Sequence, residues 1–222
     1  MSSLKDRFEW YQDRLNDASG KFGGVTICAV TKTQPVEIIN AAYDAGARVI
    51  GENRVQEFLQ KFPALNPEFT MHLIGQLQSN KVKYILDKVT MVQSVDRESL
   101  AREIHTRAVN AGQCMDVLVE VNIAGEASKG GVPIDALDAL LREMYAMEGL
   151  KVRGLMTVMP VCSNPEDIRG LFRKMRSLYD AQMDAGHEFN CLSMGMSHDC
   201  LIAAEEGATM VRLGTALFGA RQ

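Results

Sequence analysis

Lys32 is the residue whose position most suggests covalent chemistry, because it directly follows an apolar run at 26–31. A buried strand over this run delivers the amine to the mouth of a pocket. Burial among apolar groups lowers the pKa of an ammonium group, and the neutral amine condenses with an aldehyde to form a Schiff base. Most lysines are exposed. The alternative is therefore a solvated amine, and the groups that the fold places beside Lys32 decide between the two.

Two segments near the carboxyl end carry groups suited to an anion. Gly195 allows a close approach of backbone to a ligand, and Ser197 is expected to cap a helix that begins there and to meet an anion at that helix end. Gly214 and Thr215 offer backbone N–H donors and a hydroxyl. The two segments together predict a cup for a phosphate group, with an ordinary helix cap as the alternative for Ser197.

Two further polar residues interrupt apolar runs. Arg212 lies within 210–213, where a buried guanidinium needs an acceptor because an unpaired buried charge is costly. A structural salt bridge and a ligand contact explain it equally well. His72 is interpreted as an interior histidine hydrogen-bonded to backbone rather than as an acid or base. The sequence has no H-x-E, H-E-x-x-H or Cys/His cluster, so we predict no metal site.

The elements that must position these side chains are indicated by short apolar runs that alternate with amphipathic stretches. Parallel strands covered by helices are apolar on both faces, as the run at 117–121 largely is. We predict eight strands, at 25–31, 48–51, 71–75, 91–95, 116–122, 151–158, 191–194 and 209–213. Amphipathic helices are predicted at 35–45, 97–111, 133–147 and 165–185, several of them opened by proline.

Eight β-then-α units favour the α/β class, and within it a closed (β/α)8 TIM barrel rather than an open doubly wound sheet. The first strand is not followed by the G-x-G-x-x-G of a dinucleotide-binding fold. A barrel of this kind places its active site at the carboxyl ends of its strands. Lys32, Asn53, Ser197 and Thr215 all follow such ends, so we expect them to meet at one mouth. The segment 126–131 is expected to be a flexible loop at the same rim, with Lys129 solvated.

The amino end is predicted to be a helix that flanks the barrel. Leu4, Phe8, Tyr11 and Leu15 are spaced as on one face of an amphipathic helix within residues 1–20. Charged residues interrupt the segment, so we do not expect a secretory signal. No stretch approaches the roughly 18 apolar residues that a membrane span needs. We expect no membrane partner, and a single barrel domain over 1–222.

Composition narrows the partners further. The formal charge of −4 comes without a long basic run, which disfavours a nucleic-acid partner. Five cysteines, widely spaced and never in a C-x-x-C pair, predict reduced thiols and a cytoplasmic location. No exposed apolar stripe demands a second copy, so we expect a monomer.

Five segments in the right order resemble motifs of the pyridoxal phosphate homeostasis proteins. They are A-V-T-K at 29–32, G-E-N-R-V-Q-E at 51–57, H-L-I-G-Q-L-Q-S-N-K at 72–81, S-M-G-M-S-H-D at 193–199 and R-L-G-T-A-L-F-G at 212–219. The resemblance runs from about residue 25 to residue 221. This family is similar to the barrel domain of fold-type III pyridoxal phosphate enzymes such as alanine racemase. The resemblance therefore implies that type of barrel and pyridoxal 5′-phosphate as the cofactor.

The resemblance also assigns the cofactor-binding residues. It implies that Lys32 carries the cofactor as a Schiff base, and that Arg212 points at the pyridine nitrogen, as an arginine so placed does in the related racemases. The phosphate is assigned to the loops already chosen for it, and the ring to polar neighbours. The phosphate contacts are Ser197, Gly214 and Thr215, and the ring contacts are Asn53 and, less directly, Ser193.

The expected function is that of a carrier or regulator rather than an enzyme, and no catalytic residue is assigned. A permanently charged Arg212 beside the pyridine nitrogen weakens the ring as an electron sink. Racemases add a second domain and a tyrosine base. We expect no second domain, because the sequence stops at Gln222, three residues beyond Gly219, and no obvious base, because all five tyrosines fall in predicted helices. Without such a base, proton transfer loses on the order of 10²–10⁴-fold in rate.

Two other functions stay open at the level of sequence. One is a small pyridoxal-phosphate-dependent amino acid racemase or lyase. The other is a barrel enzyme for an unrelated phosphorylated metabolite, with Lys32 as a plain phosphate or Schiff-base lysine. The carrier role implies the apo forms of pyridoxal phosphate enzymes as protein partners. The sequence does not decide which of them receive the cofactor, whether transfer is direct, or whether Lys81 or Lys129 forms a second aldehyde site.

Overall fold

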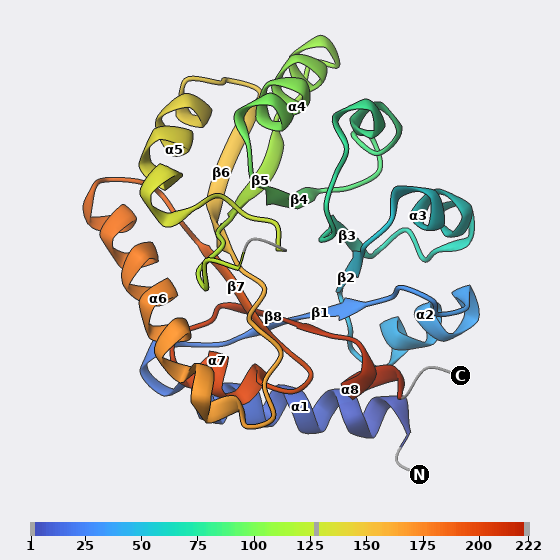
Figure 1. Ribbon diagram of the computed structural model, residues 1–222. Helices are drawn as coiled ribbons and strands as arrows, with labels where there is room; N and C mark the ends of the chain where they lie inside the picture. The colour runs from blue at the N-terminus through green and yellow to red at the C-terminus, as the bar shows by residue number, and fades with distance from the viewer. Residues whose placement is uncertain (1–2, 127–128, 220–222) are drawn as a thin grey trace.

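The computed structural model describes residues 3–126 and 129–219, which form a closed barrel of eight parallel strands surrounded by helices (Figure 1). Each strand pairs with the next, and β8 returns to pair with β1. The strands are β1 (Thr26–Val30), β2 (Val49–Glu52), β3 (Thr70–Leu73), β4 (Met91–Val95), β5 (Met115–Glu120), β6 (Leu150–Met156), β7 (Cys191–Met196) and β8 (Met210–Leu213). The prediction of a (β/α)8 barrel is therefore confirmed.

The helices lie outside the sheet and bury one apolar face against it. The α-helices are α1 (Leu4–Ser19), α2 (Val36–Asp44), α3 (Val55–Lys61), α4 (Glu98–Asn110), α5 (Leu137–Tyr145), α6 (Arg169–Asp184), α7 (Cys200–Glu205) and α8 (Thr215–Phe218). Short 3₁₀ helices are η1 (Gly20–Phe22), η2 (Phe62–Ala64), η3 (Ser79–Tyr84), η4 (Ile134–Ala136) and η5 (Pro165–Ile168). None of the described helices is long and apolar enough to cross a bilayer.

The buried apolar side chains fall into two groups on the two faces of the sheet. The larger group lies between strands and helices and includes alternate residues of β1, Ile27 and Ala29. The smaller group fills the lumen and includes the other alternate residues of β1, Cys28 and Val30. This alternation is the period of two expected of a strand. It explains why the strands read as continuous apolar runs in the sequence, because both faces are covered.

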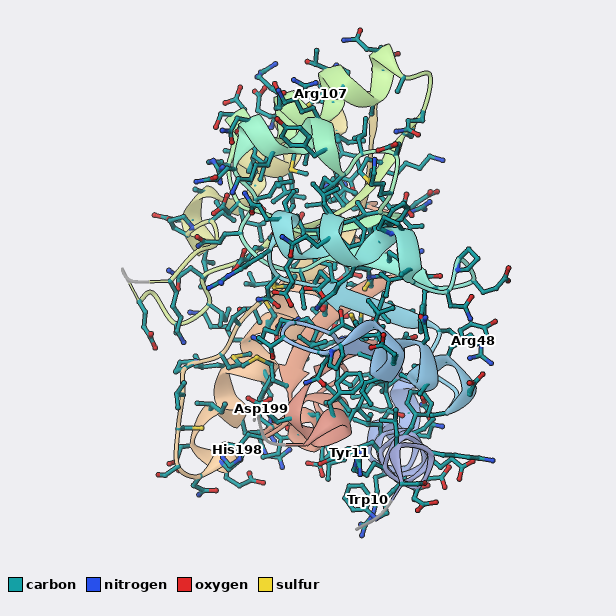
Figure 2. All side chains as sticks on the ribbon, turned by 90° about the vertical axis from the view of Figure 1, so that its right-hand side faces the viewer. Trp10, Tyr11, Arg48, Arg107, His198 and Asp199 are labelled. Carbon is teal, nitrogen blue, oxygen red and sulfur yellow. The ribbon has the colours of Figure 1, made fainter. Side chains whose placement is uncertain are left out.

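Helix α1 covers the part of the barrel where the last helix is too short. Helix α8 has four residues, which is about one turn, and α1 contacts α7, α8 and α2. Leu15 is fully buried in this contact, and the Arg7 Nε donates to the Leu217 carbonyl oxygen at 2.6 Å. Tyr11 points from α1 toward the body of the molecule, whereas Trp10 points away from it (Figure 2). The predicted flanking helix therefore completes the outer layer.

Candidate functional site

Lys32 lies in a turn at the carboxyl end of β1. The turn is closed by a hydrogen bond of 3.1 Å from the Gln34 N–H to the Thr31 carbonyl oxygen. Strand β1 ends at Val30, two residues before Lys32, and Lys32 is half-buried.

The turn after β8 is the neighbour of this lysine across the sheet. Strand β1 pairs with β8 so that Ala29 lies beside Leu213. One residue further on, a Cβ placed on Gly214 would lie 3.6 Å from the Val30 Cβ. The carboxyl end of β1, two residues before Lys32, therefore lies beside Gly214.

Ser197 connects the two segments that were predicted to hold an anion. Its Oγ accepts hydrogen bonds from the N–H groups of Gly214, at 3.3 Å, and Ala216, at 3.1 Å. Thr215 lies between these two residues and is exposed. Two backbone N–H groups that converge on one oxygen atom form the kind of concavity that binds an anion. We call this arrangement, made of Ser197, Gly214, Thr215 and Ala216, the amide cup.

The details of the segment after β7 differ from the prediction in two ways. Ser197 does not cap the helix that follows it: α7 begins at Cys200, its N-cap is Asp199, and Asp199 Oδ1 accepts the Met196 N–H at 2.6 Å. Gly195 faces that helix rather than a ligand, because a Cβ on it would lie 2.5 Å from the Ala203 Cβ. Its φ of +94° also favours glycine. Tight packing of α7 explains Gly195, and the hydroxyl of Ser197 is left to serve the amide cup.

Arg212 is buried in the lumen, and its guanidinium is bound by oxygen atoms of neighbouring strands. Nη1 donates to the Ser193 carbonyl oxygen at 2.9 Å and to Ser193 Oγ at 2.6 Å, and Nη2 donates to the Thr157 carbonyl oxygen at 2.7 Å. Within the described part of the chain no carboxylate forms an ion pair with Arg212. The salt bridge considered from the sequence is thus replaced by carbonyl oxygens, which carry partial negative charge.

Two interior residues extend this network, and the sequence analysis assigned a role to only one of them. Gln93 accepts from Ser193 Oγ at 2.8 Å, and its Nε2 lies 2.8 Å from His72 Nδ1. His72 thus has a side-chain partner where a backbone partner was expected. Burial lowers the pKa of His72 to about 4, so the imidazole is neutral. Gln93 was missed, although a polar residue inside the run 91–95 was the available signal.

Three carboxyl or amide groups have a buried oxygen without a partner among the described residues. They are Glu52, through Oε2, Asn53, through Oδ1, and Glu120, through Oε2. Burial raises the pKa of Glu120 to about 7; Asp96 raises it further, and Arg212 opposes the shift. Glu120 was also missed, and again the signal was a polar residue in an apolar strand. Buried oxygens of this kind are available as acceptors for a bound molecule.

The described part of the loop between β5 and η4 contacts the loop that follows β6. Lys129 Nζ donates to the Met159 carbonyl oxygen at 2.9 Å and lies 3.4 Å from Glu126 Oε2. The expectation of a solvated Lys129 is therefore wrong, because the side chain is half-buried between two loops. Ala127 and Ser128, which belong to the predicted flexible loop, lie outside the described residues.

The fold and its mouth define a barrel of the alanine racemase type. Residues 4–222 match the family model described as "Alanine racemase, N-terminal domain". Alanine racemase from Corynebacterium glutamicum superposes with a TM-score of 0.75 at 14% identity, over 98% of this chain and 61% of the racemase. At this identity the likeness concerns the fold alone.

Closer relatives narrow the assignment. The pyridoxal phosphate homeostasis protein of Aquifex aeolicus (strain VF5) is 46% identical over 226 residues, covering 98% of each protein. The protein of that name from Schizosaccharomyces pombe is 35% identical, covering all of this chain and 94% of the relative. PipY of Synechococcus elongatus PCC7942, solved with PLP bound, has a TM-score of 0.88 at 32% identity, covering 98% of this chain and all of PipY. The chain belongs to the pyridoxal phosphate homeostasis protein family, which confirms the resemblance found in the sequence.

Proposed function

We propose that this protein binds pyridoxal 5′-phosphate as a Schiff base on Lys32 and takes part in pyridoxal phosphate homeostasis. The observation that supports the proposal is that the amide cup follows β8, which pairs with β1, the strand that ends just before Lys32. An aldehyde that also bears a phosphate suits an amine and an anion cup placed side by side. The names of the curated relatives and the PLP-bound structure of PipY support the same ligand.

The residues present fit this cofactor. The Lys32 amine would condense with the aldehyde of bound pyridoxal phosphate, with one C=N bond formed and one water molecule released, and no other reactant would be needed. The N–H groups of Gly214 and Ala216 are already directed at one oxygen atom, that of Ser197, and a phosphate oxygen offers them a charged acceptor. We assign the exposed hydroxyl of Thr215 to the same phosphate.

We assign the pyridine ring of the cofactor to polar residues near the amide cup and in the barrel lumen. Asn53 Oδ1 is buried and unpartnered among the described residues, which leaves it able to accept from the cofactor. Arg212 keeps a full positive charge in the lumen, held by Ser193 and the Thr157 carbonyl. We assign Arg212, with Ser193 behind it, to the side of the pyridine nitrogen.

We propose that the protein loaded with pyridoxal phosphate does not catalyse substantial turnover of amino acids. Proton transfer at an amino acid carbon needs a base on the far face of the cofactor, and all five tyrosines lie in helices rather than at strand ends. The charge of Arg212 acts in the same direction, because it disfavours protonation of the pyridine nitrogen. Incubation of the loaded protein with L-amino acids in D₂O tests this: we expect no exchange of the α-proton, and exchange would restore the racemase or lyase function.

The setting that we propose is the cytoplasm, with the protein as a monomer that exchanges cofactor with apo forms of pyridoxal phosphate enzymes. The cysteines support a reducing compartment, since all five are free thiols. Size-exclusion chromatography with light scattering tests the monomer. Mixing the loaded protein with an apoenzyme, and following the activity gained, tests the exchange.

Borohydride trapping tests the proposed ligand and its attachment. The protein is saturated with pyridoxal phosphate, reduced, digested and mapped by mass spectrometry. We expect the pyridoxyl phosphate mass on Lys32, and its loss in Lys32→Ala. The matched variants Lys81→Ala and Lys129→Ala should keep the label. A saturated protein without label on Lys32 would refute the proposal, and label on Lys81 or Lys129 would reveal a second aldehyde site.

A further inference from the structure

Both peptide units that flank Lys32 are held by one cluster of side chains. The carbonyl of the unit before it, that of Thr31, accepts from Lys61 Nζ at 2.8 Å. The N–H of the unit after it, that of Thr33, donates to Glu57 Oε1 at 2.5 Å. These two peptide planes fix φ and ψ of Lys32. The direction in which its side chain leaves the backbone is therefore set from outside the residue itself.

Lys61 is the centre of this cluster. Besides the Thr31 carbonyl, its Nζ contacts Glu57 Oε1 at 2.6 Å and Glu52 Oε1 at 2.8 Å. Glu52 Oε1 also accepts from the Thr31 hydroxyl at 2.8 Å. Glu52 is 1% exposed, so its carboxylate depends on Lys61 for a counter-charge. We call Lys61, Glu57 and Glu52, with the backbone that they bind, the Lys61 cluster.

The conformation held by the cluster is not one that the turn would choose unaided. Thr33 has a φ of +64°, and it is the one non-glycine residue of the described chain with positive φ. A residue with a branched Cβ adopts this region only at an energetic cost. The surrounding structure must therefore hold Thr33 in place, and the hydrogen bond from its N–H to Glu57 does so.

We propose that Lys61 and Glu57 are positioning residues that hold Lys32 ready to bind its aldehyde. The proposal rests on the proposed function, in which Lys32 is the anchoring amine. Neither residue needs to touch the cofactor, because both act through the backbone of Thr31 and Thr33. Without the cluster, binding must also order the backbone of the turn. The cost of ordering one residue of the turn on binding would lower the affinity for pyridoxal phosphate by about tenfold, which corresponds to about 1.4 kcal/mol.

Paired variants separate positioning from simple destabilisation. Glu57→Ala removes the acceptor of the Thr33 N–H, whereas Glu57→Gln keeps a carbonyl oxygen in its place. Lys61→Met removes the ammonium, and Lys61→Met combined with Glu52→Gln avoids leaving a buried carboxylate unpaired. Lys88→Met is the matched control, because Lys88 pairs with Asp87 at 2.6 Å and neither residue contacts the turn. Thermal melting of each variant shows that it is folded.

Two readouts on Lys32 decide the proposal. One is the pyridoxal phosphate Kd, from the absorbance of the adduct. The other, in protein without cofactor, is the rate at which formaldehyde and cyanoborohydride methylate Lys32, mapped by mass spectrometry. We expect about tenfold weaker binding and an altered methylation rate in Glu57→Ala and in both Lys61 variants. Glu57→Gln should lie within about threefold of the parent protein, and Lys88→Met should match it.

The outcomes distinguish this proposal from the proposed function. Folded Glu57→Ala and Lys61→Met proteins with the parent's Kd and methylation rate would overturn the role of the cluster. A parent protein that forms no adduct on Lys32 would refute the proposed function, while the methylation rates would still decide whether the cluster controls Lys32. An equal loss in Lys88→Met would show that the effect is general destabilisation and would also overturn the role.

Discussion

Arg212 donates from Nη1 to both the main-chain carbonyl and the side-chain hydroxyl of Ser193, at 2.9 and 2.6 Å. Because the hydroxyl accepts from Arg212, its own hydrogen is directed to Gln93 Oε1, at 2.8 Å. The Gln93 amide is then oriented with Nε2 toward His72 Nδ1. His72 thereby carries its proton on Nε2. One buried cation thus sets the direction of the hydrogen bonds that run from Ser193 through Gln93 to His72.

Ser193→Ala should break this chain at its second member. The change removes an acceptor from Arg212 and a donor from Gln93, both buried, and we expect a loss of about 1–3 kcal/mol in the free energy of unfolding. Urea denaturation measures it. Ser177→Ala is the control, because that hydroxyl bonds only the Arg173 carbonyl on an exposed helix face and should cost under about 0.5 kcal/mol. Equal effects of the two changes would contradict the directed network.

His72 should make the protein less stable in mild acid. Its pKa is lowered by burial from 6.5 to about 4. The unfolded chain therefore binds a proton in this window that the folded protein does not, and stability falls as the pH drops from about 6.5 to about 4. The full effect is about 3 kcal/mol. His72→Gln should lose this pH dependence, and the exposed His198→Gln should keep it, in denaturation curves measured at several pH values.

Glu120 should make the stability of the protein depend on pH in the opposite direction. Its pKa is raised from 4.5 to about 7, so between these values the folded protein holds a proton that the unfolded chain has released. Stability then falls as the pH rises through this window, by about 3 kcal/mol at most. Glu120→Gln should equal the parent protein near pH 4 and exceed it near pH 8. A variant that is no more stable at pH 8 would show that the carboxyl titrates normally.

Gly154 should tolerate no side chain. It has a φ of +148°, and a Cβ on it would lie 1.9 Å from the Cys191 carbonyl oxygen, so β6 and β7 would have to separate. We expect Gly154→Ala to destabilise by roughly 2–4 kcal/mol. Gly170→Ala is the matched control in α6, where a Cβ meets no atom within 4 Å and a gain of about 0.5–1 kcal/mol is expected. Thermal or urea unfolding distinguishes the two signs.

The barrel itself was predictable because its cause is local and repeated. Each strand is buried on both faces, so each produces an apolar run, and β4 was predicted at the residues where it lies. Helices with a polar face were equally clear: α4 spans Glu98–Asn110 where 97–111 was predicted. The short helices α3 and α7 were less evident, since six or seven residues hardly complete two turns of a periodic pattern.

The site was predictable in outline but not in its contacts. The positions of Lys32 and of the turn after β8 follow from strand ends, which the apolar pattern reveals. The partner of Ser197 does not, because it belongs to the turn after the next strand, and only the pairing of β7 with β8 brings the two together. The same holds for Lys61 and Thr31, which are 30 residues apart and joined by a bond from helix to strand end. Hydrophobic periodicity contains no information on such pairs.

The seam between α1 and the last two helices joins the beginning of the chain to its end. During synthesis α1 precedes α7 and α8, two of the helices that it contacts, by most of the barrel. Strand β1 likewise waits for β8 before the sheet closes. The bond between Arg7 and Leu217 spans 210 residues. Closure must therefore wait until β8 and α8 have been made, and until it occurs the nascent chain presents an open sheet edge and an uncovered amphipathic helix to chaperones.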